Sequence, residues 1–366
     1  MKLLTRFLNY CMSIKKNYIC VSPFVNLEVH DTSNYMCCPS WLNKTLPGDI
    51  PLDESFNSEN AIEARKSVLD GSFKYCDSGE CPFLQKIENE IPDNNLGPLY
   101  SKDAIPEYYQ NIIDSFNRGE KLLPTTVQFS MDQSCNLSCP SCRVELIIAN
   151  SPKIKEVNLK IDEIENLFSK SIKNLYITGS GDPFVSVSFR NFLRNFNPKK
   201  YPNLKNIHLH TNATRWNKKM WDSMKAIHPY VATCEISIDA GTKYTYENKT
   251  RIGGNWDELM DNLKFISTIE TVKIIRTSFV VQKSNYKEMK IFRDMMKEFF
   301  GDRAHVYFGK ILNWGHMTEE QYNEEKVWDV NHKEHSEFLK SVNETLPFYN
   351  TRHNMYEFLK LKRYVI

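Results

Sequence analysis

Six segments between residues 125 and 312 have the composition of β-strands, and the first five alternate hydrophobic and polar residues with a period of two, the pattern of a strand whose faces meet different surroundings. Between them lie patterns with the spacing of amphipathic helices. The predicted strands are 125–131, 174–180, 206–212, 232–239, 272–281 and 304–312. The predicted helices are around 160–171, 185–195, 215–227, 255–268 and 286–300. Repeated βα units predict an α/β fold with a parallel sheet and outer helices, either a barrel or an open doubly wound sheet.

One face of this predicted sheet is polar on five successive strands. Its residues are Gln128, Ser130, Tyr176, Thr178, His208, His210, Glu235, Ser237, Asp239, Arg276 and Ser278. The other face carries Val127, Phe129, Leu175, Ile177, Ile207, Leu209, Ile236, Ile238, Ile275 and Thr277. Buried parallel strands are usually apolar on both faces. Because the helices need the apolar face, the polar face is expected to line a substrate cavity. The alternative is a core network whose polar groups satisfy one another.

The composition excludes some partners and adds little else. A formal charge of +2 on 366 residues leaves no electrostatic footprint for nucleic acid or an acidic membrane surface. No apolar stretch is long enough to span a bilayer. The apolar run at the start of the chain is broken by Arg6 and Asn9 and no small-residue cleavage site follows, so we do not interpret it as a signal peptide. A cytoplasmic protein is expected, with no nucleic acid and no membrane as partner.

The ten cysteines therefore indicate metal or redox chemistry rather than disulfides. Cys135, Cys139 and Cys142 follow the first predicted strand in the spacing C-x3-C-x2-C, at the end where α/β folds place active sites. Four-iron clusters are ordinarily held by four thiolates. Three thiolates leave one iron open to a small molecule. The alternative is a zinc site completed by a distant His or Cys, although zinc patterns usually consist of two separated pairs.

The triplet resembles the signature of the radical S-adenosylmethionine (SAM) superfamily. The resemblance implies a partial (β/α)6 TIM-type barrel and a 4Fe-4S cluster whose open iron chelates the amino and carboxylate groups of SAM. Reductive cleavage of SAM then yields a 5'-deoxyadenosyl radical, which abstracts hydrogen from the substrate. The protein supplies positioning and excludes water.

Later segments resemble the family's SAM-binding segments in the same order, over residues 123–312. The implied contacts are Gly179, Ser180, Gly181 and Asp182 for the SAM amino group, Thr211 and Asn212 in the next loop, Ser237 and Asp239 for the ribose, Arg251 for the carboxylate, and Val281 and Gln282 for adenine. Two departures stand out. Asp182 replaces the family's Glu, and Ser141 stands where an aromatic residue commonly precedes the third Cys.

The early cysteines resemble the SPASM or twitch type of auxiliary module, which implies a second 4Fe-4S cluster. Position by position, the ligands are Cys20, Cys37, Cys76 and Cys81. Cys38 competes with Cys37, because adjacent side chains in an extended segment point in opposite directions. The usual module follows the barrel, whereas this one precedes it, and a zinc knuckle with the same ligands is the alternative. Cys11 and Cys234 are interpreted as small hydrophobic residues.

Three regions are predicted: an auxiliary iron-sulfur module over 1–100, the barrel over 120–315 and a helical extension over 316–366. In the extension, residues 332–346 and 355–363 have helical patterns and are expected to pack over the sheet.

The resemblance implies radical modification of a polar substrate, with a peptide or protein side chain first and a carbohydrate, aminoglycoside or nucleotide as alternatives. The cavity would be lined by His208 and Arg276 together with three candidate catalytic residues, Glu235, His210 and Tyr176. A flavodoxin- or ferredoxin-type protein would donate the electron. The competing hypotheses are a zinc-dependent hydrolase or transferase using His208 and His210, and a non-catalytic, metal-stabilised binding module.

Overall fold

The computed structural model describes residues 15–89, 97–346, 351–355 and 358. The chain divides into two compact units. The first consists of Met1–Met131, Leu159–Leu175 and Lys199–Leu204, and the second of Asp132–Asn158, Tyr176–Pro198 and Lys205–Ile366. Each unit is described by itself.

The first unit contains short strands that hold the early cysteines. β1 (Tyr18–Cys20) pairs antiparallel with β5 (Leu99–Ser101). β2 (Asn26–Val29) pairs antiparallel with β3 (Ser33–Tyr35) and parallel with β6 (Thr126–Phe129), and β3 pairs antiparallel with β4 (Leu46–Pro47). The helices of this part of the chain are α2 (Ser22–Val25), α3 (Leu52–Phe56), α4 (Glu59–Leu69), α5 (Pro82–Glu88) and α6 (Glu107–Asn117), and a 3₁₀ turn η1 (Lys102–Ala104) follows β5.

Arg65 of α4 organises the centre of this unit. Its side chain is buried and donates to the carbonyl oxygens of Pro23 (2.9 Å) and Phe56 (2.7 Å). The guanidinium also lies 4.5 Å from the ring centroid of Phe56. Burial lowers the pKa of Arg65 to about 9. These bonds fix the backbone of α2, directly after Cys20, to the helix α4.

All six predicted strands are confirmed, and helices alternate with them along the chain. After β6 come β7 (Asn174–Ile177), which crosses the boundary of the two units, β8 (Asn206–Thr211), β9 (Thr233–Ser237), β10 (Ile274–Val281) and β11 (Ala304–Lys310). The intervening helices are α7 (Ser151–Phe168), α8 (Val187–Arg194), α9 (Lys218–Asp222), α11 (Trp256–Ser267) and α12 (Met289–Phe300). The fold is mixed α/β, and its order of elements is that of the predicted partial (β/α)6 barrel.

Short helical turns complete the connections of this region. They are η2 (Pro198–Lys200), η3 (Lys225–Tyr230), α10 (Lys243–Thr245), the π-helical turn η4 (Tyr246–Thr250), η5 (Tyr286–Glu288) and η6 (Gly301–Arg303).

Two predicted helices differ from the observed ones. The helix predicted around 160–171 begins at Ser151, so its first turns were missed. The helix predicted around 215–227 is broken into α9 and the 3₁₀ turn η3. The break falls at Met224, whose φ of −126° and ψ of 37° are not helical, and Pro229 lies within η3.

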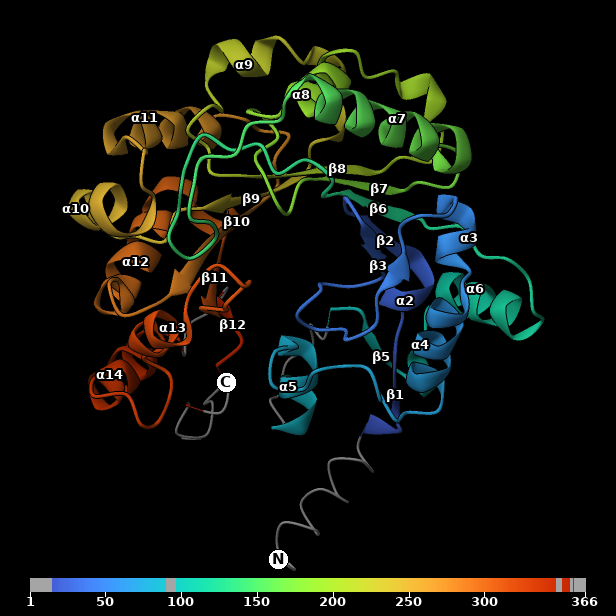
Figure 1. Ribbon diagram of the computed structural model, residues 1–366, viewed down its shortest axis with the longest axis horizontal. Helices are drawn as coiled ribbons and strands as arrows, with labels where there is room; N and C mark the ends of the chain where they lie inside the picture. The colour runs from blue at the N-terminus through green and yellow to red at the C-terminus, as the bar shows by residue number, and fades with distance from the viewer. Residues whose placement is uncertain (1–14, 90–96, 347–350, 356–357, 359–366) are drawn as a thin grey trace, which may run out of the picture. The chain divides into compact units, whose positions relative to one another are not determined.

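The strands of the second unit form a parallel sheet in the order β8-β9-β10-β11-β12, where β12 is Thr351–His353 (Figure 1). The register aligns His210 with Glu235, Glu235 with Arg276, and Arg276 with His305. Because aligned residues of neighbouring strands share a face, one row of polar side chains crosses four strands.

The predicted division into an apolar and a polar face is confirmed. The apolar positions named above, from Val127 to Thr277, are all fully buried. The polar face is buried in part. Its half-buried residues are Gln128, Tyr176, His210, Glu235, Ser237 and Arg276, and its buried residues are Ser130, Thr178, His208, Asp239 and Ser278. In the second unit, Phe279 of β10 and Phe308 of β11 pack on Phe292 of α12, with ring centroids 5.0 and 6.0 Å away. The helices therefore cover the apolar face (Figure 1).

The first predicted tail helix is confirmed as α14 (His335–Thr345), preceded by α13 (Glu319–Glu325). α14 contacts η5 and α12, the helix that covers the sheet. In the contact with η5, the Tyr286 hydroxyl bonds to Glu334, which directly precedes α14, and to Glu337. The second predicted tail helix lies, apart from Met355 and Phe358, outside the described residues. Among the helices of the described ranges, none has the length and apolar character needed to cross a membrane.

Candidate functional site

The three cysteines of the triplet lie on one loop of the second unit. Its backbone is fixed by bonds from the Cys135 amide to the Ile147 carbonyl (2.9 Å) and from the Cys142 amide to the Cys139 carbonyl (2.9 Å). Cys135 and Cys139 are buried, and Cys142 is exposed. Cys139 and Cys142 thus share one turn, and Cys135 is fixed separately in the same loop.

Each sulfur of the triplet accepts one N–H bond from a different residue. The pairs are Asn212 Nδ2 to Cys135 Sγ at 3.5 Å, Arg251 Nη1 to Cys139 Sγ at 3.6 Å, and Arg143 Nη2 to Cys142 Sγ at 3.5 Å. Two of the donors are cationic, and such donors stabilise thiolates and the negative charge of an iron-sulfur cluster. Sequence reasoning assigned no role to Arg143, although it directly follows the third Cys.

Arg143 also ties the triplet to the loop after β7. Its guanidinium donates to the carbonyl oxygens of Gln133 and Ser180, each at 2.7 Å. Gly181 is packed so closely that a Cβ there would lie 2.4 Å from the Asp132 carbonyl oxygen. Glycine is therefore required at this position by the neighbouring backbone.

Asp182 binds its own chain with both carboxylate oxygens. It is fully buried, and it accepts bonds from the Thr211 hydroxyl (2.7 Å) and from the amides of Asn212 (2.9 Å) and Phe184 (2.9 Å). Burial raises the pKa of Asp182 against the effect of these donors. The carboxylate therefore holds the loop after β8, and with it Asn212, beside Cys135.

Asp239 and Arg251 form a buried ion pair, with Arg251 Nη2 2.7 Å from Asp239 Oδ2. Asp239 has a left-handed φ of 58°, and its other oxygen accepts the Val280 amide at 2.7 Å. Burial disfavours the charged form of Arg251, but the carboxylate of Asp239 outweighs it and raises the pKa of Arg251. A fixed cation thus lies between Asp239 and Cys139.

The remaining residues that are predicted to contact SAM lie at or just after the carboxyl ends of β7, β9 and β10. Ser237 Oγ is 3.0 Å from both His210 Nε2 and Ser278 Oγ. Val281 and Gln282, at the end of β10, are buried, and the Gln282 amide donates to the Asn285 side chain at 2.9 Å. Gly179 is exposed.

Glu235 and Arg276 form the charged centre of the polar face. Arg276 Nη1 lies 3.1 Å from Glu235 Oε2, and His210 Nε2 lies 3.9 Å from Glu235 Oε1. Burial alone would raise the pKa of Glu235, but His210 and Arg276 lower it to about 2. Glu235 is therefore ionised at neutral pH.

His208 and Tyr176 form an aromatic pair beside this centre, with ring centroids 4.7 Å apart. His208 Nδ1 is bonded to Thr233 Oγ1 at 2.7 Å. Burial lowers the pKa of His208 to about 3, so the imidazole is neutral. Burial raises the pKa of Tyr176, which keeps its phenolic hydrogen. The predicted catalytic residues Glu235, His210 and Tyr176 thus all lie on one face of the second unit.

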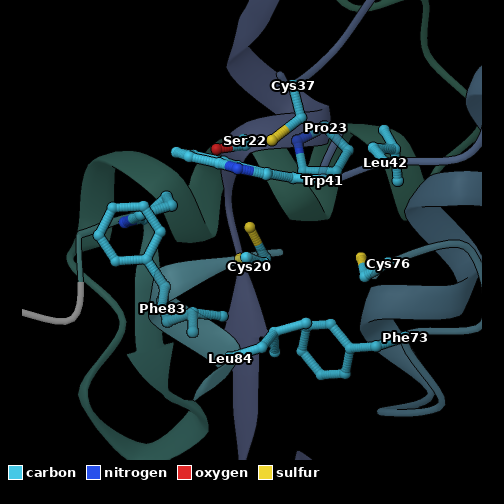
Figure 2. Close-up of a pocket in the computed structure, with 13 residues that line it drawn as sticks. Cys20, Ser22, Pro23, Cys37, Trp41, Leu42, Phe73, Cys76, Phe83 and Leu84 are labelled. Atoms are coloured by element: carbon cyan, nitrogen blue, oxygen red, sulfur yellow. The ribbon is translucent and has the colours of Figure 1, made fainter. Parts of the chain in front are cut away.

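The early cysteines meet in the first unit. Cys20, Cys37, Cys76 and Cys81 line one pocket. Its wall is otherwise almost entirely apolar and includes Pro23, Trp41, Leu42, Phe73, Phe83, Leu84, Pro98 and Leu99. In Figure 2 the sulfurs of Cys20, Cys37 and Cys76 turn toward the same space. Burial raises the pKa of Cys20 to about 12, so thiolates here need the positive charge of a metal.

Local structure presents each of the four sulfurs separately. Cys20 ends β1, Cys37 follows β3, and Cys81 immediately precedes α5. Cys76 forms an isolated bridge with Leu42. Cys38 does not line the pocket, and its sulfur lies 3.2 Å from Ser40 Oγ.

Among the residues that the structure describes, no three His, Cys, Asp or Glu side chains are grouped to hold a single metal ion. A four-iron cluster differs, because each thiolate binds a separate iron. Two sets of cysteines, one of three and one of four, fit such clusters.

An α/β fold with a three-cysteine loop at the carboxyl ends of its strands defines a class of iron-sulfur enzymes that bind a small molecule at an open iron. The radical SAM superfamily profile matches residues 130–294, and this part of the chain is a radical SAM domain. That family implies a 4Fe-4S cluster and SAM. Comparison with curated proteins finds no match.

Solved structures that match parts of this chain include two of SuiB from Streptococcus suis. Free SuiB is 15% identical, with a TM-score of 0.43 over 89% of this chain and 69% of SuiB. SuiB bound to the precursor peptide SuiA is 16% identical, with a TM-score of 0.39 over 64% and 57%. The enzyme anSMEcpe with bound AdoMet and the Cp18Cys peptide is 16% identical, with a TM-score of 0.42 over 61% and 59%. In these matches the chain spans 57% to 69% of the other protein's length.

Proposed function

We propose that this protein is a radical SAM enzyme whose catalytic 4Fe-4S cluster is held by Cys135, Cys139 and Cys142. The observation that carries the proposal is the set of three N–H donors, one to each sulfur. Donors to all three sulfurs suit a negatively charged cluster, whereas three isolated thiols have no need of them. When bound, the cluster and SAM supply the reductive cleavage that starts a radical reaction.

The residues around the triplet are proposed to bind SAM in the roles that the family resemblance implies. Gly179, Ser180 and Gly181 border the amino group, Ser237 the ribose, and Val281 and Gln282 the adenine. For the two carboxylates Asp182 and Asp239 the contacts support a positioning role. Asp182 holds Asn212 beside Cys135, and Asp239 holds Arg251 beside Cys139.

A second, auxiliary 4Fe-4S cluster is proposed in the first unit, held by Cys20, Cys37, Cys76 and Cys81. The support is the convergence of these cysteines on one pocket with an apolar wall. Four protein ligands make this cluster closed, so it serves electron relay or shapes its surroundings. A flavodoxin- or ferredoxin-type protein in the reducing cytoplasm is the proposed electron source.

The substrate is proposed to be a peptide or protein side chain that meets the polar face of the second unit. Glu235, ionised, and His210 are placed to bind and orient polar groups, and Tyr176 carries the phenolic hydrogen for return to a substrate radical. Oxidation, epimerisation and cross-linking all begin with the same hydrogen abstraction.

The experiment is anaerobic reconstitution with iron and sulfide, followed by reduction with dithionite in the presence of SAM. Brown protein with on the order of eight irons, by analogy with two four-iron clusters, and release of 5'-deoxyadenosine is the expected result. A protein in which Cys135, Cys139 and Cys142 are all changed to Ala should release none. Release by that variant, or colourless parent protein carrying only zinc, would overturn the proposal.

A further inference from the structure

Arg276 uses only part of its guanidinium within the protein. Nη1 bonds to Glu235 at 3.1 Å, and its Nε and Nη2 have no partner among the residues that the structure describes. The side chain is 36% exposed, whereas that of Glu235 is 13% exposed. A guanidinium presents several donors in a planar fork that matches a carboxylate. The side of the Arg276 guanidinium that Glu235 does not contact can therefore donate hydrogen bonds to an anion on the polar face.

Neighbouring strands add further donors to this side. The register places His305 of β11 beside Arg276, and Tyr307 beside Ser278. The charge of Arg276 acts on the phenols of both Tyr176 and Tyr307. Phenolic hydroxyls and a neutral imidazole donate hydrogen bonds without adding charge.

The charges on this face of β9 to β12 favour an anion. In the described residues of these strands, Glu235 is the acidic residue of the face, while Arg276 and Arg352 are cationic. Arg352 aligns with Tyr307, and its charge reaches His305. Glu235 contacts Arg276 through Nη1, so the opposite side of this guanidinium keeps its positive charge toward the polar face.

We propose that Arg276, assisted by Tyr176 and His305, binds a carboxylate of the peptide substrate, either an acidic side chain or the C-terminus. This inference rests on the proposed function and names the substrate group that its polar face recognises. A bidentate Arg–carboxylate contact fixes orientation as well as position, so the site sets which C–H bond of the substrate faces the radical.

The alternative is an ion pair that only stabilises the fold. The two roles predict opposite effects of changing Glu235. If the pair is structural, Glu235→Gln leaves an uncompensated cation and gains no ligand. If Arg276 binds a carboxylate, Glu235 competes with the ligand, and its neutralisation strengthens ligand binding.

The test uses 4-fluorobenzoate as a probe, observed by ¹⁹F NMR on the reconstituted protein saturated with SAM, so that the SAM carboxylate site is filled. The neutral 4-fluorobenzamide is the control ligand. Arg276→Gln should weaken benzoate binding about 10- to 100-fold, the range for loss of a hydrogen bond to a charged group. Glu235→Gln should tighten benzoate binding, and Arg276→Lys should retain part of the affinity. Arg190→Gln, which removes a guanidinium bonded only to backbone carbonyls, should leave it unchanged.

Equal binding of the amide, or parent-like benzoate binding by Arg276→Gln, overturns the inference. An acetylated and amidated Ala-Glu-Ala peptide and an acetylated tri-alanine with a free C-terminus are then added as competitors. Displacement by the first identifies an acidic side chain, displacement by the second the C-terminus, and displacement by neither contradicts a peptide carboxylate. If Arg276→Gln fails to fold, the other two variants decide. Tighter benzoate binding by Glu235→Gln and weakened binding by Arg276→Lys support the inference, and parent-like binding by both contradicts it. Release of 5'-deoxyadenosine from SAM, measured on the same samples, tests the proposed function separately.

Discussion

Arg143 Nη2 lies 3.5 Å from Cys142 Sγ, and the same guanidinium donates to the carbonyl oxygens of Gln133 and Ser180. One side chain therefore joins the triplet to the loop after β7 and places a positive charge beside a proposed iron ligand. A reduced cluster carries one more negative charge than the oxidised one, so this contact stabilises the reduced state.

Changing Arg143 to Met should lower the reduction potential of the cluster, because both the charge and the N–H donor are lost. Activity should fall by about 10- to 100-fold, as is typical for residues that support metal ligands. The measurement is a redox titration followed by EPR in the absence of SAM. Arg190→Met serves as the matched control, since Arg190 donates only to the carbonyls of Phe184 and Val185. An unchanged potential in an Arg143→Met protein with full iron content would show that Arg143 is only structural.

Gly181→Ala should destabilise the triplet loop. The added Cβ would lie 2.4 Å from the Asp132 carbonyl oxygen and 2.8 Å from that of Ser134, and backbone cannot move aside cheaply. A cost of about 1–3 kcal/mol is expected from overpacking, together with loss of roughly half the iron. Gly119→Ala is the control for space, because no atom lies within 4 Å of an added Cβ there, and its φ of 79° makes Ala unfavourable through the backbone alone, a strain that Gly181 does not share. Equal iron content in the two variants would contradict this reading of the loop.

Cys37 and Cys38 offer a matched pair for the auxiliary site. Cys37 lines the pocket with Cys20, Cys76 and Cys81, while Cys38 contacts Ser40 instead. Cys37→Ala should remove on the order of four irons, the content of one cluster, and Cys38→Ala should remove none. Iron analysis after reconstitution is the measurement. Iron loss in Cys38→Ala but not in Cys37→Ala would show that Cys38 is the ligand. Full iron content in both variants would contradict an auxiliary cluster at this site.

His208 should make stability depend on pH in a defined direction. Its folded-state pKa of about 3 lies below the ordinary value near 6.5, because burial disfavours the imidazolium. The neutral form is therefore favoured in the folded state, and its contribution is complete above pH 6.5 and lost as the pH falls toward 3. Between pH 6 and 4, the free energy of unfolding measured in urea should fall by about 1.4 kcal/mol per pH unit more for the parent protein than for His208→Gln. Parallel curves for the two proteins would contradict a buried neutral His208.

The strands were predictable because buried apolar residues alternate with more exposed polar residues along them. In β9, Cys234 and Ile236 are fully buried while Glu235 and Ser237 are half-buried, and the period of two follows directly. The start of α7 was missed for the opposite reason. Between residues 151 and 159 only Val157 is buried, so no amphipathic period exists to detect. The signals present were chemical: the Asn150 side chain accepts the Lys153 amide, and Pro152 lies in the first turn.

The residues of the candidate site were proposed from the sequence, but their contacts could not be predicted from it. Asn212 and Arg251 lie 77 and 112 positions from the cysteines that they contact, and only the fold brings them together. An acidic residue in a loop also looks the same in a sequence whether it faces a ligand or the backbone. Asp182 binds Thr211, Asn212 and Phe184 of its own chain, which no local pattern indicates.

The central claim is that two cysteine sets hold two clusters and that only the triplet's cluster is open to SAM. EPR of the reduced protein with and without SAM tests it most directly, using a variant that lacks Cys135, Cys139 and Cys142 and one that lacks Cys20, Cys37, Cys76 and Cys81. The account predicts that each variant retains on the order of four irons and that SAM changes the spectrum only where the triplet remains. A spectrum that responds to SAM in the variant without the triplet, or loss of all iron from either variant, would contradict it.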